Sequence, residues 1–255
     1  MSTTLDFSPA PGAAPAARRI LTHARTEATL LIRNGEQLLL ALVIPIGILI
    51  GGRFFGSRLG LDLSVTAPSV LGLAVLSSGF TSLAISTGFE RRYGVLERLA
   101  ATPLTRTGLL VGKAVALLWV TGGQLVILAV VALALGWRPV FHPLAALVAI
   151  IAIGLGLVAY AAWGLVLAGT LRAEITLALA NLVYLTLLAA GAVLVPVANY
   201  PGPLRATVEL VPTAALGEAL RGASTGTPHW WTLFVLLVWA ALGLVLARKV
   251  FRWMS

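Results

Sequence analysis

The segment FERRYGVLERLAATPLTRTGLLVGK, residues Phe89–Lys113, contains seven charged side chains and separates two long apolar runs. The whole chain of 255 residues has only 18 Lys and Arg and 9 Asp and Glu. A charged, helix-like connector between apolar segments has to lie in water, because an unpaired charge in hydrocarbon is costly. The segment therefore predicts a membrane protein whose residues 89–113 form an aqueous connector between two spans.

The composition of the chain points to the same class. Hydrophobic residues make up 59% of it and charged residues 11%, whereas an ordinary soluble domain has about 25% charged residues. Cysteine is absent, and the three His are far apart, so we expect no disulfide, no catalytic thiolate and no metal site. The net charge of +9 comes from basic residues that cluster at membrane ends, so it does not indicate a nucleic-acid partner.

Six stretches are long and apolar enough to cross a membrane, which takes about 20 residues. They are continuously apolar rather than alternating, so we expect helices and not a β-barrel. Residues 1–16 are rich in Ser, Pro and Ala and predict a disordered tail, followed by one transmembrane domain, 17–255. The predicted fold is an all-α membrane protein with spans at about 37–55, 68–89, 108–135, 143–171, 175–197 and 230–247.

The distribution of basic residues predicts the orientation. If both termini and the second and fourth loops share one side, that side carries thirteen Lys and Arg and the other side five. Basic residues favour the cytoplasmic side, so we expect both termini in the cytoplasm. Residues 17–36 form an amphipathic helix with Arg18, Arg25 and Arg33 on its polar face, suited to the cytoplasmic interface. It is either a simple anchor or an elbow that also touches a cytoplasmic partner.

The connector itself has an apolar face, formed by Phe89, Tyr93, Leu96 and Ala100. Gly94 interrupts this helix and predicts a bend. The helix ends at Thr102-Pro103, because a residue before proline is pushed out of the α region, and Thr105 or Thr107 would cap the next span. The connector is either a loop that only sets topology or a docking element, and its mixed charge and apolar face favour docking.

Several connector motifs carry a family resemblance. Glu90, the run Gly94-Val95-Leu96-Glu97-Arg98-Leu99, Ala101-Thr102-Pro103-Leu104 and Gly112-Lys113 resemble the cytoplasmic connector of ABC exporter permeases of the ABC type 2 membrane family, which includes antibiotic-resistance and polysaccharide exporters. Val95 departs from the pattern, since many relatives have Thr there. The resemblance implies a coupling helix that sits in a groove of an ATPase subunit, with contacts from Glu90, Arg91, Arg92, Tyr93, Gly94, Leu96, Glu97, Arg98 and Leu99.

The chain carries no ATPase motif of its own. The stretch GLLVGKA, residues 108–114, is one residue too short for a phosphate-binding P-loop and lacks its hydroxyl residue. ATP and Mg²⁺ are therefore expected on a partner ATPase. The resemblance implies two ATPase copies, a dimer with a second permease (itself or a paralogue), and a place in the bacterial plasma membrane.

The longest outer loop, residues 198–229, predicts two short helices. Leu204, Val208 and Val211 recur at helical spacing, and Thr213 would cap a second helix ending near Arg221, with Gly222 just beyond. The resemblance implies a partly re-entrant outer lid with Glu209, Glu218 and Arg221 near the exit. The alternative is an exposed loop with incidental helices.

Polar residues inside the spans are either packing contacts or lining of a pathway. Ser78, Thr81, Asn181 and Tyr184 are the candidates for such a lining. No span centre carries an acidic or basic residue, which disfavours a proton relay. The leading hypothesis is thus the permease subunit of an ATP-driven exporter of a hydrophobic or amphipathic substrate, such as a drug, a lipid or a glycan-linked lipid. The alternatives are a secondary transporter or channel without an ATPase, and an intramembrane enzyme, which would need catalytic groups that are missing.

Overall fold

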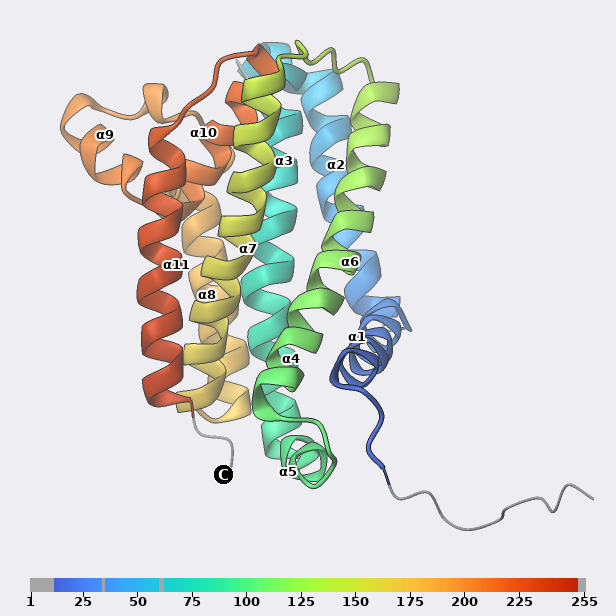
Figure 1. Ribbon diagram of the computed structural model, residues 1–255. Coiled ribbons are helices and arrows are strands. Elements are labelled where there is room, and N and C mark those ends of the chain that lie inside the picture. Colours follow the sequence, from blue (N-terminus) through green and yellow to red (C-terminus); the bar gives the residue numbers. More distant parts are fainter. Residues whose placement is uncertain (1–11, 34, 60–61, 252–255) are drawn as a thin grey trace, which may run out of the picture.

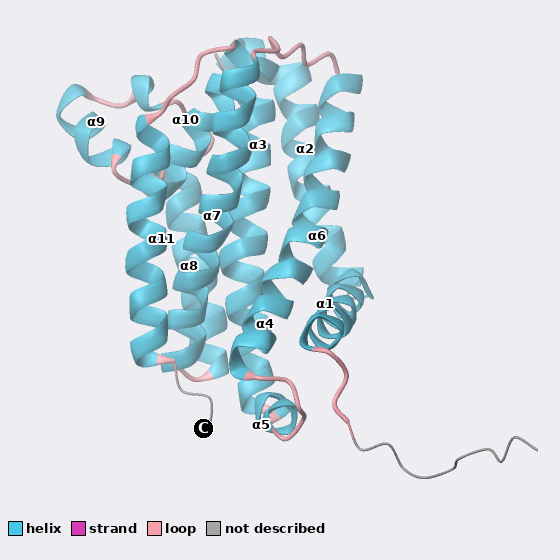
Figure 2. Cartoon of the chain, viewed as in Figure 1, coloured by secondary structure: helices cyan, strands magenta, loops and turns pink. Residues whose placement is uncertain are grey.

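The computed structural model describes residues 12–33, 35–59 and 62–251, and this part of the chain forms helices joined by loops, with no strand (Figure 2). In chain order the elements are α1 (Ala16–Arg33), α2 (Gly35–Leu59), α3 (Leu63–Leu76), η1 (Ser77–Ser82), α4 (Leu83–Arg92), α5 (Val95–Ala100), α6 (Arg106–Ala134), α7 (Pro143–Thr170), α8 (Ala173–Ala190), η2 (Val197–Asn199), α9 (Gly202–Glu209), α10 (Pro212–Thr225) and α11 (Trp231–Val250). Most of the predicted disordered tail, up to residue 11, lies outside the described residues.

The long helices run side by side in one bundle (Figure 1). Within the described residues, five helices are long and apolar enough to cross a membrane, and α2 adds the shorter apolar stretch Ala41–Gly56. The predicted six-span, all-α membrane fold is therefore confirmed. The five are Leu63–Arg92, Thr107–Ala134, Pro143–Thr170, Ala173–Ala190 and Trp231–Val250.

The first of these five, Leu63–Arg92, is one continuous helix that changes its winding in the middle. α3 is followed by six residues of π-helix, η1, and then by α4. A π-helical turn holds one more residue than an α-helical turn, and such turns are frequent at functional sites. Gly164 of α7 packs beside this turn, since a Cβ there would lie 3.0 Å from the carbonyl oxygen of Phe80.

The main core forms around α7, which contacts α3, α4, α10 and α11. Val148, Ala152, Leu157 and Tyr160 of α7 are buried there, together with Leu216 of α10. Small residues on α7 let the neighbouring helices approach closely, which is how helices associate in lipid, where no hydrophobic effect drives them together. Trp163 continues this contact toward α11, where its ring centroid lies 5.5 Å from that of Trp239.

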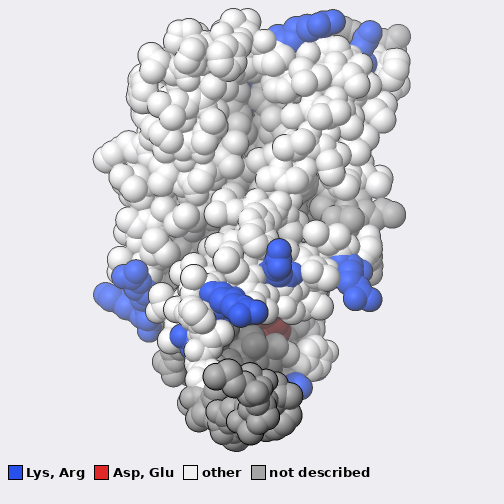
Figure 3. Space-filling model, turned by 45° about the vertical axis from the view of Figure 1, so that its right-hand side comes forward, with Lys and Arg blue, Asp and Glu red and all other residues white. Residues whose placement is uncertain are grey.

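The two ends of the bundle differ. α1 and α5 lie across one end, which also holds residue 251, and we call it the α5 end (Figure 1). α9 and α10 lie at the other, which we call the α10 end. On the face shown in Figure 3, Lys and Arg side chains gather near each end and the surface between them carries none. An apolar belt between two charged levels is the surface that a lipid bilayer requires.

Two expected boundaries at the α10 end are wrong. The fifth span was expected to reach residue 197, but α8 ends at Ala190, because Arg221 and Thr213 bind the carbonyl oxygens that follow and replace helical bonds. The second short helix was expected to end near Arg221 before Gly222. It continues to Thr225 and ends at Gly226, whose φ of 81° is the left-handed conformation suited to glycine.

Candidate functional site

The connector at the α5 end is two helices joined by a sharp turn. α4 ends at Arg92, and Gly94 has a φ of 66°, a left-handed value that costs a residue with a Cβ free energy. The predicted bend at Gly94 is therefore confirmed. Beyond it, α5 buries Leu96, which is 2% exposed, and turns Glu97 and Arg98 to the surface.

Side-chain hydrogen bonds hold the connector in shape. Arg98 reaches back over the turn, and its Nη2 donates to the Tyr93 carbonyl at 2.7 Å. The Thr102 hydroxyl donates to the Leu99 carbonyl at 2.6 Å and closes the end of α5. The cap of α6 is Thr105 and not Thr107, because Thr105 Oγ1 accepts the backbone N–H of Gly108 at 3.0 Å.

The nine predicted contact residues do not share one surface. Arg91 donates to the carbonyl oxygens of Ala168 and Leu171, at 2.9 and 3.0 Å, and so caps the end of α7. Arg92 forms an ion pair with Glu174 of α8. Glu90 faces into the bundle. Glu90 and Arg91 therefore position the connector, and its exposed surface is formed by Arg92, Tyr93, Glu97, Arg98 and the partly exposed Gly94 and Leu99, with Leu96 buried beneath them.

Glu90 belongs to a buried ionic cluster with Lys113 and Glu27. Lys113 Nζ lies 2.7 Å from each carboxylate oxygen of Glu90 and 3.0 Å from Oε2 of Glu27. The Lys113 side chain is only 4% exposed, and those of Glu27 and Glu90 are 15% and 19% exposed. Removing one member of such a cluster leaves a buried charge uncompensated, which is costly. The cluster thus ties three elements together: α1, α4 and α6.

At the same place α1 and α6 approach each other closely. Gly112, next to Lys113, faces His23 of α1, and a Cβ on Gly112 would lie 2.5 Å from Cδ2 of His23. Only glycine allows this approach. His23 is buried, and its Nε2 lies 3.6 Å from Oε1 of Glu27, so it stands at the edge of the ionic cluster.

The stability of the protein is expected to fall as the pH drops below 6.5, because of His23. Burial lowers the pKa of His23 from its usual 6.5, while the Glu27 carboxylate opposes this and Lys113 adds to it. The unfolded chain then binds the proton more readily, so the stability contributed by neutral His23 is present above pH 6.5 and is lost as the pH falls through the lowered pKa. Thermal unfolding in detergent on both sides of pH 6.5 measures this, and His23→Gln should flatten the dependence. An equal loss in both proteins would contradict it.

A cavity of about 810 Å³ opens between α2, η1, α6 and α8, on the side of the bundle toward α1. All four candidate lining residues are among its walls: Ser78 and Thr81 from η1, and Asn181 and Tyr184 from α8. Gln124 of α6 joins the walls, since its Nε2 donates to the Ala41 carbonyl at 2.7 Å and its Oε1 accepts the Ser78 hydroxyl at 2.8 Å. Of the described residues that line the cavity, none is acidic or basic.

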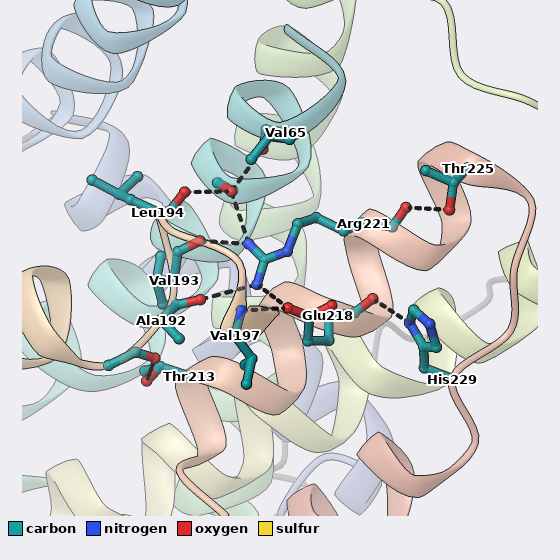
Figure 4. Close-up of polar contacts among 12 residues, drawn as sticks. Val65, Ala192, Val193, Leu194, Val197, Thr213, Glu218, Arg221, Thr225 and His229 are labelled. Carbon is teal, nitrogen blue, oxygen red and sulfur yellow. Dashed lines mark hydrogen bonds and ion pairs between the residues drawn. The ribbon is translucent and has the colours of Figure 1, made fainter. Parts of the chain in front are cut away.

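A second polar cluster lies at the α10 end, around Arg221 (Figure 4). Its Nη1 donates to Ser69 Oγ of α3 and to the Val193 carbonyl, both at 3.0 Å. Its Nη2 donates to the Ala192 carbonyl at 3.0 Å and to Oε1 of Glu218 at 2.9 Å. One guanidinium group thus joins α3 and α10 to the non-helical segment after α8, 191–196.

Glu218 completes this cluster. Its Oε1 also accepts the backbone N–H of Val197 at 3.0 Å, and its carbonyl lies 3.0 Å from Nδ1 of His229 (Figure 4). Of the three predicted lid residues, Glu218 and Arg221 therefore lie together in the interior, whereas Glu209 is exposed at the end of α9. Thr213, expected as a helix cap, instead donates to the carbonyl of Gly191 at 2.6 Å.

Sequence reasoning missed the partners of Glu90. Glu27 had no assigned role, and Lys113 was counted among the basic residues of the cytoplasmic side and in the Gly112-Lys113 motif, with no partner assigned to it. A signal was present, because Glu27 lies toward the apolar side of an amphipathic helix and Lys113 lies inside an apolar span, and both positions require an opposite charge. Among the described residues, no group of three or more His, Cys, Asp or Glu could hold a metal ion.

Comparison with known proteins is consistent with the connector resemblance. No curated protein matches the sequence significantly. The model of one family, the ABC-2 type transporter, matches residues 18–224, which run from α1 to nearly the end of α10. The match includes the connector, the ionic cluster, the cavity walls from α2 to α8, and the Arg221 cluster. Its extent shows that this multi-pass membrane protein belongs to the ABC-2 type transporter family, as a permease component.

Proposed function

We propose that the chain is the permease subunit of an ATP-driven exporter, and that α5 is the coupling helix that docks on a separate ABC ATPase. Membership in the ABC-2 family supports an ATPase partner, since permeases of this kind work with one. The observation that carries the assignment to α5 is its exposed face, with Tyr93 61% exposed beside Glu97 and Arg98. An exposed aromatic ring next to charges of both signs is typical of a binding surface.

The attachment of α5 supports transmission of movement as well as docking. Leu96 is buried under the helix, and the side chains just before the turn, Glu90 through Arg92, bind α6, α7 and α8. A displacement of α5 by a closing ATPase would therefore act on several spans at once.

The orientation follows from the proposed docking. The α5 end would face the cytoplasm of a bacterial cell, with the chain in the plasma membrane and both termini on the cytoplasmic side. The excess of basic residues in the loops of this end supports it. Arg18, Arg25 and Arg33 of α1 are all exposed at this end, where they would meet the membrane interface.

The lining of the cavity supports the proposed class of substrate. Its described walls are apolar with a few uncharged polar groups, as in pockets that bind largely apolar ligands. We infer that a hydrophobic or amphipathic substrate, such as a drug, a lipid or a glycan-linked lipid, passes along Ser78, Thr81, Asn181 and Tyr184. Drug export of this kind would give antibiotic resistance. A dimer of permeases with two ATPases, which bind ATP and Mg²⁺, completes the proposed complex, and the Arg221 cluster forms its outer lid.

Co-purification with a candidate ABC ATPase tests the docking of α5. Glu97→Lys reverses an exposed charge on α5, and Tyr93→Ala removes the exposed ring. Each is expected to weaken ATPase association about tenfold or more, because a like charge or a lost aromatic anchor at an interface costs at least about 1.4 kcal/mol. The loss of stimulated ATP hydrolysis should follow.

The matched control is Glu209→Lys, the same charge reversal on an exposed residue at the α10 end. It is expected to leave ATPase association unchanged. Equal association of the Glu97 and Tyr93 variants with wild type, at equal expression in the membrane, would overturn the coupling role of α5.

A further inference from the structure

One face of α1 is exposed and has both basic and apolar side chains. It consists of Arg18, Leu21, Arg25, Thr29 and Ile32, which we call the α1 strip, and their spacing places them within about 80° of one another around the helix, at 100° per residue. We propose that the α1 strip binds the anionic headgroups of membrane lipids and that this contact sets the position of the connector α5.

The strip carries positive charge that the protein does not neutralise. Arg18 and Arg25 are exposed and have no ion pair or hydrogen bond from their side chains within the described residues. The acidic residue of the same helix, Glu27, lies on the opposite face, where it pairs with Lys113. The charge of the strip is therefore available to an external anion, and each basic residue near an anionic membrane surface strengthens binding about fivefold.

The apolar members of the strip indicate a lipid rather than a protein partner. Leu21 is 48% exposed and Ile32 is 54% exposed, on the face that also holds Arg25. An arginine can place its charge among headgroups while its aliphatic stem and neighbouring apolar side chains reach the acyl chains. α1 lies across the α5 end of the bundle (Figure 1), one of the two ends at which Lys and Arg side chains gather (Figure 3).

The opposite face of α1 is attached to both ends of the connector. Before α5, Glu90 is joined to Glu27 of α1 through Lys113. After α5, the carbonyl of Pro103 accepts a hydrogen bond from Arg19 of α1. A lipid that holds α1 in place therefore holds α5 at two points. The effect of this attachment on transport rests on the proposed docking of α5, whereas the binding of lipid to the α1 strip does not depend on that docking.

Lipid retention tests the first step. The full chain is purified from detergent micelles that contain phosphatidylcholine and phosphatidylglycerol, and the bound lipids are quantified by mass spectrometry. Wild type should enrich phosphatidylglycerol. The double variant Arg18→Gln with Arg25→Gln should lower that enrichment by more than tenfold, because each arginine contributes a factor of about five. Arg18→Lys with Arg25→Lys should preserve it.

The matched control removes two exposed arginines at the same end but outside α1, Arg172→Gln with Arg248→Gln. It should change the enrichment much less than the α1 variant. An equal decrease in both double variants would mean a general charge effect and would overturn the proposal, as would an unchanged enrichment in the α1 variant. Lost ATPase association with unchanged lipid retention would assign the strip to a protein partner and would also overturn it.

Amide hydrogen exchange tests the second step, with no ATPase present. In bilayers with phosphatidylglycerol, residues 90–105 should exchange more slowly than in phosphatidylcholine alone, and Arg18→Gln with Arg25→Gln should abolish the difference. Glu90→Gln should keep lipid retention and reduce the slowing. If the exchange of the wild-type connector does not respond to the lipid, the proposed link between the α1 strip and α5 is refuted. The docking of α5 is tested separately, by the co-purification experiment.

Discussion

Lys113→Met is expected to destabilise the protein by about 3–5 kcal/mol, because it leaves the two largely buried carboxylates of Glu27 and Glu90, 15% and 19% exposed, facing each other without a cation. Methionine has nearly the same length as lysine, so packing against α1 and α4 is largely kept and the loss reports the charge. Thermal unfolding in detergent, followed by tryptophan fluorescence, measures the effect. The same substitution at the exposed Lys249 of α11 is the control and should change stability by no more than about 0.5 kcal/mol.

A rescue separates the charge from the shape of Lys113. When Glu27→Gln and Glu90→Gln are added to Lys113→Met, the buried charges disappear together, and stability should return toward that of wild type. A triple variant as unstable as Lys113→Met alone would show that packing, and not the uncompensated carboxylates, caused the loss.

Arg221→Met is expected to cost a similar amount, about 3–5 kcal/mol, at the other end of the bundle. It leaves the Glu218 carboxylate without its ion pair and removes the donor from the carbonyl oxygens of Ala192 and Val193. A buried acceptor without a donor costs about 1–3 kcal/mol. Hydrogen exchange should therefore rise first in residues 191–199, and thermal unfolding should occur at a lower temperature.

Arg205→Met provides the comparison, because Arg205 also donates to loop carbonyl oxygens, those of Tyr200 and Ala198, but is exposed. Water replaces its hydrogen bonds, so a loss of about 1 kcal/mol or less is expected. Equal losses for the two arginines would show that burial of Arg221 does not matter.

The spans were largely predictable, because lipid demands long apolar helices and the sequence supplies them as continuous runs. The turn at Gly94 was predictable for a local reason too, since glycine after a helical segment favours a break. These features depend on neighbouring residues in the chain, and the hydropathy and turn rules describe such neighbours well.

The features that sequence reasoning missed depend on partners far away in the chain. The end of α8 at Ala190 was missed, because Val193 and Val197 are as apolar as a span, although Gly191 is the C-cap residue of the helix. The donors that replace the helical bonds come from distant residues, Thr213 and Arg221. Lys113 and Glu27 are 86 positions apart, so the local sequence around either residue does not indicate the other as its partner. Arg221 was expected near the exit because of the family resemblance, although the donors of its guanidinium group bind partners in the interior.

The π-helix η1 has a consequence for the angular position of the connector. A turn that holds one more residue changes the angular position of everything beyond it by roughly one residue's share of an α-helical turn, about 100°. The face of α4 that meets Lys113 is thus selected in the middle of the membrane, at Ser77–Ser82, and not at the connector. With an ordinary α-helical turn there, Glu90 would point to a different neighbour, and α5 would leave the bundle in a different direction. The same six residues therefore form the hydroxyl-rich wall of the cavity and set the direction in which α5 leaves the bundle.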